Sequence, residues 1–374
     1  MKRSGPYRAD QVGSLLRPAA VKQARAERAK GEIDDVQLKK IEDEAISQVV
    51  ANEERVGLQA VTDGEFRREG WAIDFFSALQ GVKVTEMETA PRAQGASGSF
   101  SNKLKVARVV DKVSLGPHPM VDHFRYLKSV AKVTPKITVP APTMIVSAAR
   151  DWRFVVERSA YNELDEFLDD MGQVYRDFMM AIYNEGGRYL QFDDVNMSYL
   201  CDKDMRAKLV ERGDDPDRLL QSWVRVLNSV LAKRPDDMTI TTHVCRGNFR
   251  SAWFAQGGYE PVADALFNQL DYDGYFLEYD SDRAGGFEPL RLLPRGKKRV
   301  VLGLMTTKTG VLEDRELIRS RIEAATEFAP LEQLCLSPQC GFASSEEGNI
   351  LEEAEQWNKL GQIVELAHEV WPQG

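Results

Sequence analysis

The sequence predicts an α/β protein, specifically a (β/α)8 barrel formed as one domain by residues 1–374. Eight short runs rich in Val, Ile, Leu and Phe suit parallel strands that are buried on both faces. Segments with helical spacing of apolar residues follow most of these runs, which is the order that a barrel requires. The length of 374 residues is sufficient for one large barrel. A doubly wound open sheet shows the same alternation, so the count of strands leaves both architectures open.

The predicted elements are distributed along the whole chain. The strands are Gln11–Leu15, Leu58–Asp63, Ile137–Pro140, Tyr189–Asp193, Met238–Val244, Tyr275–Tyr279, Val300–Met305 and Gln333–Ser337. The helical pattern of Ala19–Val56 is interrupted near Gly31, so we expect two helices there. Asn162–Asn184 carries apolar residues at helical spacing and is predicted as one long helix. Further helices are predicted at Leu219–Leu231, Pro261–Leu270, Arg315–Phe328 and Ile350–Val370.

One segment departs from the alternation of strands and helices. Val82–Pro119 lies between the second and third predicted strands, and its central part, residues 90–102, is rich in Ala, Gly and Ser. We predict a β-hairpin with the arms Val82–Thr85 and Lys105–Val113 and a flexible tip. This inserted excursion is a candidate for covering the barrel mouth or for a contact in a homo-oligomer.

The charge and the cysteine count exclude several classes of protein. The net charge of −9 and the pI near 5.3 argue against nucleic acid and against an anionic membrane surface as partners. No apolar run approaches the roughly 20 residues that a spanning helix needs, and no signal peptide is visible in Met1–Ala9. Four cysteines are too few for a disulfide scaffold, which favours a reducing cytoplasm.

The end of the fifth predicted strand carries a pattern typical of a metal site. His243 and Cys245 are two residues apart, so their side chains point to the same face of the strand. Zinc favours a mixture of imidazole and thiolate ligands. A single His-x-Cys is weak evidence, and a core histidine beside a buried thiol is the structural alternative.

Two residues from other predicted strands strengthen the metal hypothesis. Glu278 lies at the end of the sixth strand, and Cys340 follows the eighth. The C-terminal ends of barrel strands converge on one mouth, so residues distant in sequence can share one ion there. Together with His243 and Cys245 they form a candidate tetrahedral zinc site with one exchangeable ligand.

These residues resemble the zinc site of the cobalamin-independent methionine synthases, and the resemblance extends along the chain. The matching motifs are Val12-Gly13-Ser14, Gly64-Glu65, Gln191-Phe192-Asp193-Asp194, His243-x-Cys245, Glu278 and Pro338-x-Cys340-Gly341. The chain is most similar to short relatives that hold only the catalytic barrel. The resemblance implies a (β/α)8 barrel that transfers a methyl group from a methylated pterin to the sulfur of homocysteine.

The resemblance also implies a role for each site residue. His243, Cys245 and Cys340 would be permanent zinc ligands, and Glu278 would loosen when the substrate thiolate arrives. Zinc suits this role because coordination deprotonates a thiol whose ordinary pKa is about 8.5. Glu65 and Asp193 would bind the substrate ammonium, while Ser14 and its backbone amide would receive the carboxylate. The alternative is that both acids form ordinary ion pairs with neighbouring arginines.

Two departures from the family concern the methyl donor. The long enzymes have a tryptophan that stacks on the pterin after the third strand, whereas Pro142–Ala148 contains no aromatic residue. They also have a histidine after the seventh strand, where this chain reads Met305-Thr306-Thr307-Lys308. A leaving pterin nitrogen needs a proton. We therefore expect the proton from water, Asp194 or Asp280, and slower turnover with methyltetrahydrofolate than with a methylcorrinoid.

Two other functions remain open from the sequence. An epoxyalkane:coenzyme M transferase also uses a zinc thiolate, but its thiol carries a sulfonate and no ammonium, so paired acids at Glu65 and Asp193 argue against it. A zinc-binding barrel without turnover would instead have a closed site of four protein ligands that does not change with substrate.

Overall fold

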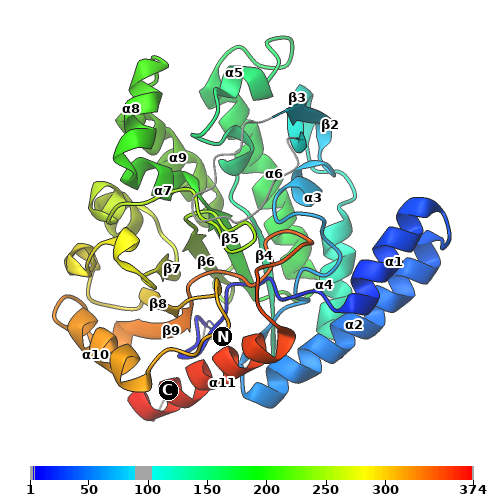
Figure 1. Ribbon diagram of the computed structural model, residues 1–374. Coiled ribbons are helices and arrows are strands. Elements are labelled where there is room, and N and C mark those ends of the chain that lie inside the picture. The colour runs from blue at the N-terminus through cyan, green and yellow to red at the C-terminus, as the bar shows by residue number, and fades with distance from the viewer. Residues whose placement is uncertain (1–2, 4, 89–102, 373–374) are drawn as a thin grey trace.

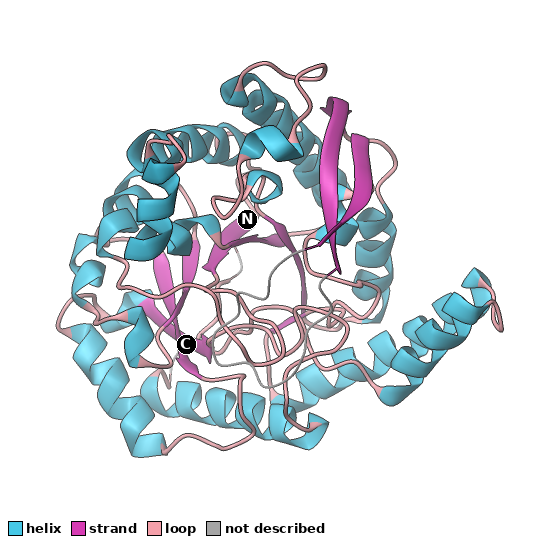
Figure 2. Cartoon of the chain, turned by 45° about the horizontal axis from the view of Figure 1, so that its top comes forward, coloured by secondary structure: helices cyan, strands magenta, loops and turns pink. Residues whose placement is uncertain are grey.

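A curled, parallel sheet surrounded by helices forms the centre of the molecule (Figures 1 and 2). The computed structural model describes residues 3, 5–88 and 103–372. Every neighbouring pair in the seven-stranded sheet is parallel. The strands, in order across the sheet, are β1 (Ala60–Val61), β4 (Thr134–Pro140), β5 (Tyr189–Asp194), β6 (Thr239–Val244), β7 (Gly274–Glu278), β8 (Arg299–Met305) and β9 (Leu334–Pro338). The predicted α/β barrel is confirmed.

The N-terminal segment lies between the two outer strands of this sheet. Ala9 forms a parallel bridge with Leu336 of β9. On the other side, the backbone N–H of Leu15 donates to the carbonyl of Gly64, just after β1 (3.0 Å). Residues 9–15 therefore occupy the position of the eighth strand of the barrel and bring Ser14 to the barrel mouth.

The prediction of a regular strand at Gln11–Leu15 is wrong, and the hydrogen bonds of this segment explain why. Three successive carbonyls accept from side chains instead of from a neighbouring strand. Their donors are Lys136 Nζ to Gln11 (2.5 Å), Gln191 Nε2 to Val12 (2.6 Å) and Thr62 Oγ1 to Gly13 (2.7 Å). Side-chain donors from β4, from β5 and from Thr62 just after β1 thus replace the hydrogen bonds of a neighbouring strand, which the apolar pattern alone cannot reveal. The seven other predicted strands occur, although Leu58–Asp63 shortens to β1.

Most helix predictions are also confirmed. The principal helices are α1 (Ala19–Lys30), α2 (Asp35–Val56), α4 (Pro119–Val130), α6 (Leu164–Asn184), α8 (Lys203–Glu211), α9 (Pro216–Leu231), α10 (Arg315–Thr326) and α11 (Glu353–Val370). Short helices are α3 (Ile73–Phe76), α5 (Trp152–Val155) and α7 (Asn196–Cys201). Gly31 ends α1 with a positive φ of 75°, as expected for a helix break at glycine. Pro261–Leu270 is not an α-helix but a 3-10 turn followed by a π-helix at Ala265–Gln269.

The helices pack on the barrel through the apolar faces that the sequence indicates. In α6, Phe167, Met171, Val174 and Phe178 are buried at helical spacing. Burial of each such side chain is worth about 1.5–3 kcal/mol, so this face fixes α6 against the sheet and α9. The α1–α2 pair projects from the side of the barrel (Figure 2). No helix in the described part of the chain is long and apolar enough to cross a membrane.

The predicted excursion is a β-hairpin outside the barrel. Its arms are β2 (Gln80–Glu88) and β3 (Lys103–Ser114), which pair antiparallel and extend beyond the predicted limits. The arms lie beside α3 and α6 on the outer wall (Figures 1 and 2). The predicted flexible tip falls in 89–102, outside the described residues.

Candidate functional site

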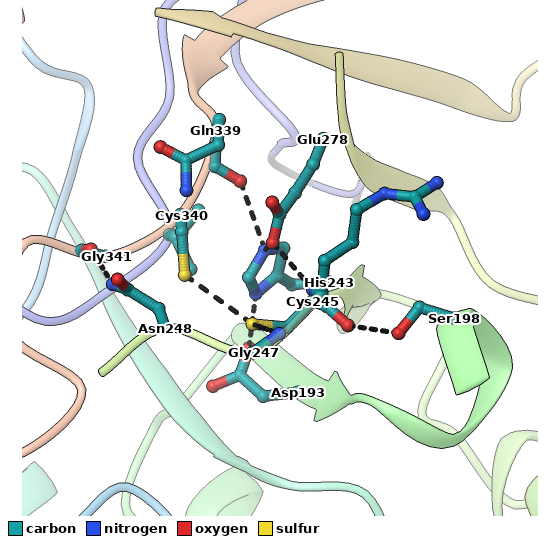
Figure 3. A network of polar contacts seen from close by, with 12 residues as sticks. Asp193, Ser198, His243, Cys245, Gly247, Asn248, Glu278, Gln339, Cys340 and Gly341 are labelled. Carbon is teal, nitrogen blue, oxygen red and sulfur yellow. Dashed lines mark hydrogen bonds and ion pairs between the residues drawn. The ribbon is translucent and has the colours of Figure 1, made fainter. Parts of the chain in front are cut away.

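Four potential metal ligands meet at the mouth of the barrel (Figure 3). His243 belongs to β6, Cys245 follows that strand directly, Glu278 is the last residue of β7, and Cys340 follows β9. One ligand atom from each lies within 4.8 Å of the others, and all four side chains are buried. The barrel therefore brings together the four residues that the sequence singles out as ligands.

The chemistry and spacing of this cluster fit a zinc ion. The sulfur atoms of Cys245 and Cys340 are 3.6 Å apart, and His243 Nε2 lies 3.9 Å from Glu278 Oε1. Two thiolates, one imidazole and one carboxylate are a ligand set for zinc, whereas calcium and magnesium take oxygen ligands. A divalent cation would also neutralise the negative charge that these buried groups concentrate.

The electrostatics of the cluster show strong interaction among its members. Cys245 and Cys340 share a hydrogen bond that raises the pKa of Cys245 and lowers the pKa of Cys340, so one proton serves both sulfurs. Burial raises the pKa of Glu278, but the charges of Lys308, Arg283 and His243 outweigh it and lower that pKa. Such coupled groups are typical of metal and catalytic sites.

Neighbouring groups orient the four candidate ligands. The Nδ1 atom of His243 faces Asp193 Oδ1 at 3.6 Å, and Nε2 lies 3.3 Å from the carbonyl of Gln339 and 3.9 Å from Glu278 Oε1 (Figure 3). Glu278 accepts from the backbone N–H of Arg246 (2.8 Å) and from the guanidinium of Arg283 (3.0 Å). A carboxylate behind a ligand histidine is the usual second partner in protein metal sites.

Glu65 has an unusual backbone and an unsatisfied carboxylate. Its φ of 61° is in the left-handed region, which is costly for a residue with a side chain and is often found at functional sites. The side chain is 3% exposed. Its Oε1 accepts from Thr138 Oγ1 (2.7 Å) and lies 3.3 Å from Arg68, whereas Oε2 has no hydrogen-bond partner in the described part of the chain. A buried acceptor of this kind is suited to a cationic ligand.

Two glycines allow Ser14 to lie between Glu65 and the metal cluster. A Cβ at Gly13 would stand 2.7 Å from Thr138 Cγ2 and 3.2 Å from Glu65 Oε1. A Cβ at Gly341 would stand 2.0 Å from Ser14 Oγ, so only glycine permits this approach. Since Gly341 follows Cys340, Ser14 lies directly beside a candidate metal ligand.

Asp193 is fixed by a residue that sequence reasoning gave no role. Gln191 Nε2 donates both to Asp193 Oδ1 (2.7 Å) and to the carbonyl of Val12 (2.6 Å). Gln191 and Asp193 are two residues apart on β5, so both side chains face the barrel interior. This spacing could have indicated the hydrogen bond between them. The bond ties Asp193 to the segment that carries Ser14.

The two predicted proton donors occupy different environments. Asp194 lies on the opposite face of β5 from Asp193, where it accepts from the backbone N–H of Met197 (3.1 Å) and from Thr143 (3.4 Å). Burial raises its pKa to about 6, but the structure does not bring it to the cluster. Asp280 lies beside the cluster, because Arg283 binds both Asp280 (2.8 Å) and Glu278.

Lys308 is a further site residue that the sequence analysis did not single out. It follows β8, and its Nζ atom is buried without a hydrogen-bond partner among the described residues. Its position just past a barrel strand was a signal that could have identified it.

The chain belongs to the family of cobalamin-independent methionine synthase catalytic domains. Residues 8–369 match the family described as "Cobalamin-independent synthase, Catalytic domain". Two Bacillus subtilis relatives carry the names "Uncharacterized protein YxjH" and "Uncharacterized protein YxjG". YxjH is 42% identical over 99% of this chain and 96% of its own length, and YxjG is 43% identical with the same coverage.

Solved structures agree with this assignment. A structural-genomics target from Listeria monocytogenes, assigned to the vitamin-B12 independent methionine synthases, is 36% identical, covers 99% of each chain and has a TM-score of 0.79. A B12-independent methionine synthase from Shewanella in complex with selenomethionine has a TM-score of 0.71 over 98% of each chain. At 17% identity the Shewanella structure supports the fold alone.

Proposed function

We propose that this protein is a zinc-dependent methyltransferase that converts homocysteine to methionine. The observation that carries the proposal is the buried cluster of His243, Cys245, Glu278 and Cys340, together with Glu65, whose Oε2 atom has no hydrogen-bond partner among the described residues. The cluster provides for a metal-bound thiolate, and Glu65 provides for the ammonium of an amino acid. The family of the chain supports the same reaction.

When bound here, zinc would hold the sulfur of the substrate as a thiolate at neutral pH. His243, Cys245 and Cys340 would remain as ligands, and Glu278 would be the one that loosens. Glu278 suits this role because the N–H of Arg246 and the guanidinium of Arg283 already bind its two carboxylate oxygens. A displaced carboxylate would therefore keep two hydrogen-bond donors in a buried site.

The amino-acid part of the substrate would lie between the cluster and β1. Glu65 Oε2 would accept a hydrogen bond from the ammonium, and Asp193, held by Gln191, would supply the second negative charge. Ser14 would receive the carboxylate beside Cys340. The partners of the protein would thus be a small-molecule thiol and a methyl donor. A reducing cytoplasm would keep the two ligand thiols available for metal.

A coenzyme M-dependent epoxide opening is the second candidate, and one feature of the site argues against it. A sulfonate thiol would place a second negative charge near Glu65, whose Oε1 pairs with Arg68 (3.3 Å) but whose Oε2 has no hydrogen-bond partner among the described residues. Repulsion between two buried anions is unfavourable. An amino-acid thiol avoids this cost because it presents its ammonium there.

The proposal is tested with purified, zinc-loaded protein supplied with homocysteine and either methyltetrahydrofolate or methylcobalamin. Methionine, measured by mass spectrometry, is expected with at least one donor and should disappear in Cys340→Ser. Cys335→Ala is the matched control, since Cys335 is a buried cysteine of β9 outside the cluster. No methionine from either donor, with zinc bound and the protein folded, would leave a non-catalytic zinc barrel as the better explanation.

A further inference from the structure

Lys308 presents its ammonium group to the protein interior, against the usual behaviour of lysine. Lysine normally buries its aliphatic stem and keeps the charged end in water. Here the residue as a whole is partly exposed, yet its Nζ atom is buried and has no hydrogen-bond partner in the described part of the chain. An ammonium group has three donors, so this arrangement is costly unless an acceptor from outside the chain joins it.

The loop that carries Lys308 is fixed to the metal cluster. The backbone N–H and the hydroxyl of Thr307 donate to Gln339 Oε1 at 2.6 and 3.0 Å, and Gln339 precedes Cys340 directly. Asn349 Nδ2 donates to the carbonyl of Thr307 (2.9 Å). Lys308 is therefore held between the ends of β7 and β9, and its inward direction is not that of a loose surface side chain.

The charge of Lys308 acts on the cluster itself. Burial raises the pKa of Glu278, and Lys308 is the strongest of the opposing charges, ahead of Arg283, which lies 3.0 Å away. The hydrogen bond from Cys245 lowers the pKa of Cys340, and Lys308 adds to this effect. Burial raises the pKa of Asp280, and the charge of Lys308 acts to lower it. The buried ammonium is thus close enough to the cluster for its charge to act on Glu278 and Cys340.

The position of Lys308 separates it from the groups proposed to hold the amino acid. Glu65 follows β1 and Asp193 lies on β5, whereas β8 is separated from β1 by β9 and the N-terminal segment and from β5 by β6 and β7. The amino acid therefore has its own acids on one side of the mouth. The ammonium of Lys308, on the other side of the barrel mouth, is then available to the methyl donor, which is the second substrate.

We propose that Lys308 is a catalytic residue that gives a hydrogen bond and a proton to the leaving nitrogen of the methyl donor. This inference rests on the proposed methyl transfer and assigns the proton donor for a methyl donor whose leaving atom is a nitrogen. The substrate sulfur forms a bond to the methyl carbon while the C–N bond breaks. The electron pair of that bond stays on nitrogen and takes the proton from Nζ. Lys308 is left as a neutral amine and regains a proton from water.

The test compares two donors that differ in their need for a proton. Zinc-loaded native protein and Lys308→Met are supplied with homocysteine and either methyltetrahydrofolate, whose leaving atom is a nitrogen, or methylcobalamin, whose leaving group needs no proton. Loss of a general acid typically costs 100-fold or more, so kcat with the folate should fall by about 100-fold. The methylcobalamin rate reports any effect of the lost charge on the metal cluster, and it should fall at least tenfold less than the folate rate. The matched control is Lys297→Met, an exposed lysine near the opposite end of β8.

Binding measurements add a readout that is independent of turnover. Lys308→Met should bind tetrahydrofolate about tenfold more weakly in calorimetry, the loss expected for one charged hydrogen bond, with zinc content and homocysteine affinity measured on the same samples. Lys308→Arg should restore tetrahydrofolate binding but not folate turnover, because arginine keeps the charge and does not release a proton.

The outcomes separate this proposal from the proposed function. Equal losses with both donors, or no loss with either, would overturn the role of Lys308 while methyl transfer stands. Native protein that makes methionine from neither donor contradicts the proposed function. In that case, unchanged tetrahydrofolate binding in Lys308→Met would overturn the assignment of Lys308 as well, and weaker binding would retain it as a ligand-binding group.

Discussion

The substitution Glu65→Gln tests how the protein recognises an amino acid. Glutamine keeps the size of the side chain and an oxygen that can accept from Thr138 Oγ1, 2.7 Å away in the native protein. It removes the negative charge and replaces the unsatisfied Oε2 by an NH2 group, which cannot accept from an ammonium. The left-handed backbone at this position is equally demanding for both residues. Because the buried ion pair between Glu65 and Arg68 (3.3 Å) is lost, the stability of the variant is measured beside its binding.

The size of the effect follows from the burial of the contact. Glu65 is 3% exposed, so water cannot replace the lost interaction. A hydrogen bond to a charged group is worth about 1.5–3 kcal/mol, and each 1.4 kcal/mol is a factor of ten in affinity. The homocysteine dissociation constant should therefore rise by about 10- to 150-fold, with one zinc per chain retained.

The assay is calorimetric titration of the zinc-loaded variant with homocysteine, with zinc measured on the same samples. Glu69→Gln is the matched control, because Glu69 is four residues away and forms an exposed ion pair with Lys105. The control should bind like the native protein. Unchanged homocysteine affinity in Glu65→Gln would refute the reasoning, since the ammonium would then have to lie elsewhere.

Three further predictions concern the metal cluster and pH. Serine at Cys245 or Cys340 should remove most of the zinc, and a full equivalent in both variants by elemental analysis would exclude this site. Removal of zinc with a chelator, followed by mild oxidation, should join the same two sulfurs, which are 3.6 Å apart, into one disulfide per chain. The disulfide should block zinc uptake and can be detected by peptide mapping. An apoprotein that stays reduced would contradict this prediction. Burial lowers the pKa of His118 to about 4, whereas in the unfolded chain it is about 6.5. Between pH 6.5 and 4 only the unfolded state takes up this proton, so the free energy of unfolding falls as the pH is lowered. His118→Asn removes this proton and can still cap α4. Between pH 7 and 5 its free energy of unfolding, measured with urea, should fall by about 2 kcal/mol less than that of the native protein. Equal losses would show that His118 does not titrate in this way.

The grouping of the four candidate metal ligands could be predicted because it follows from two geometric rules. Parity along β6 places His243 and Cys245 on one face, and the convergence of strand ends brings Glu278 and Cys340 to them. Most strands could also be predicted from the sequence, because their continuous apolar runs reflect burial on both faces of the sheet.

Other features depend on tertiary contacts that no local pattern encodes. The segment Gln11–Leu15 resembles a strand in sequence, but side chains from β4, from β5 and from Thr62 just after β1 donate to its backbone carbonyls. The alternation of side chains along a strand places the candidate ligands His243 and Cys245 on one face, and it places Asp194 on the opposite face from Asp193. This rule was not applied to the predicted proton donors. Lys308 was not recognised because lysine is ordinarily exposed, and only the folded chain shows its ammonium buried.

The central claim is that this barrel binds an amino-acid thiol as a metal-bound thiolate. The most direct measurement is calorimetric titration of zinc-loaded protein with homocysteine and, separately, with coenzyme M, in two buffers of different ionisation enthalpy. The account predicts that homocysteine binds with release of about one proton per zinc, because a thiol with a pKa near 8.5 enters as a thiolate, and that coenzyme M binds weakly or not at all. Homocysteine binding without proton release, or tighter binding of coenzyme M, would contradict it.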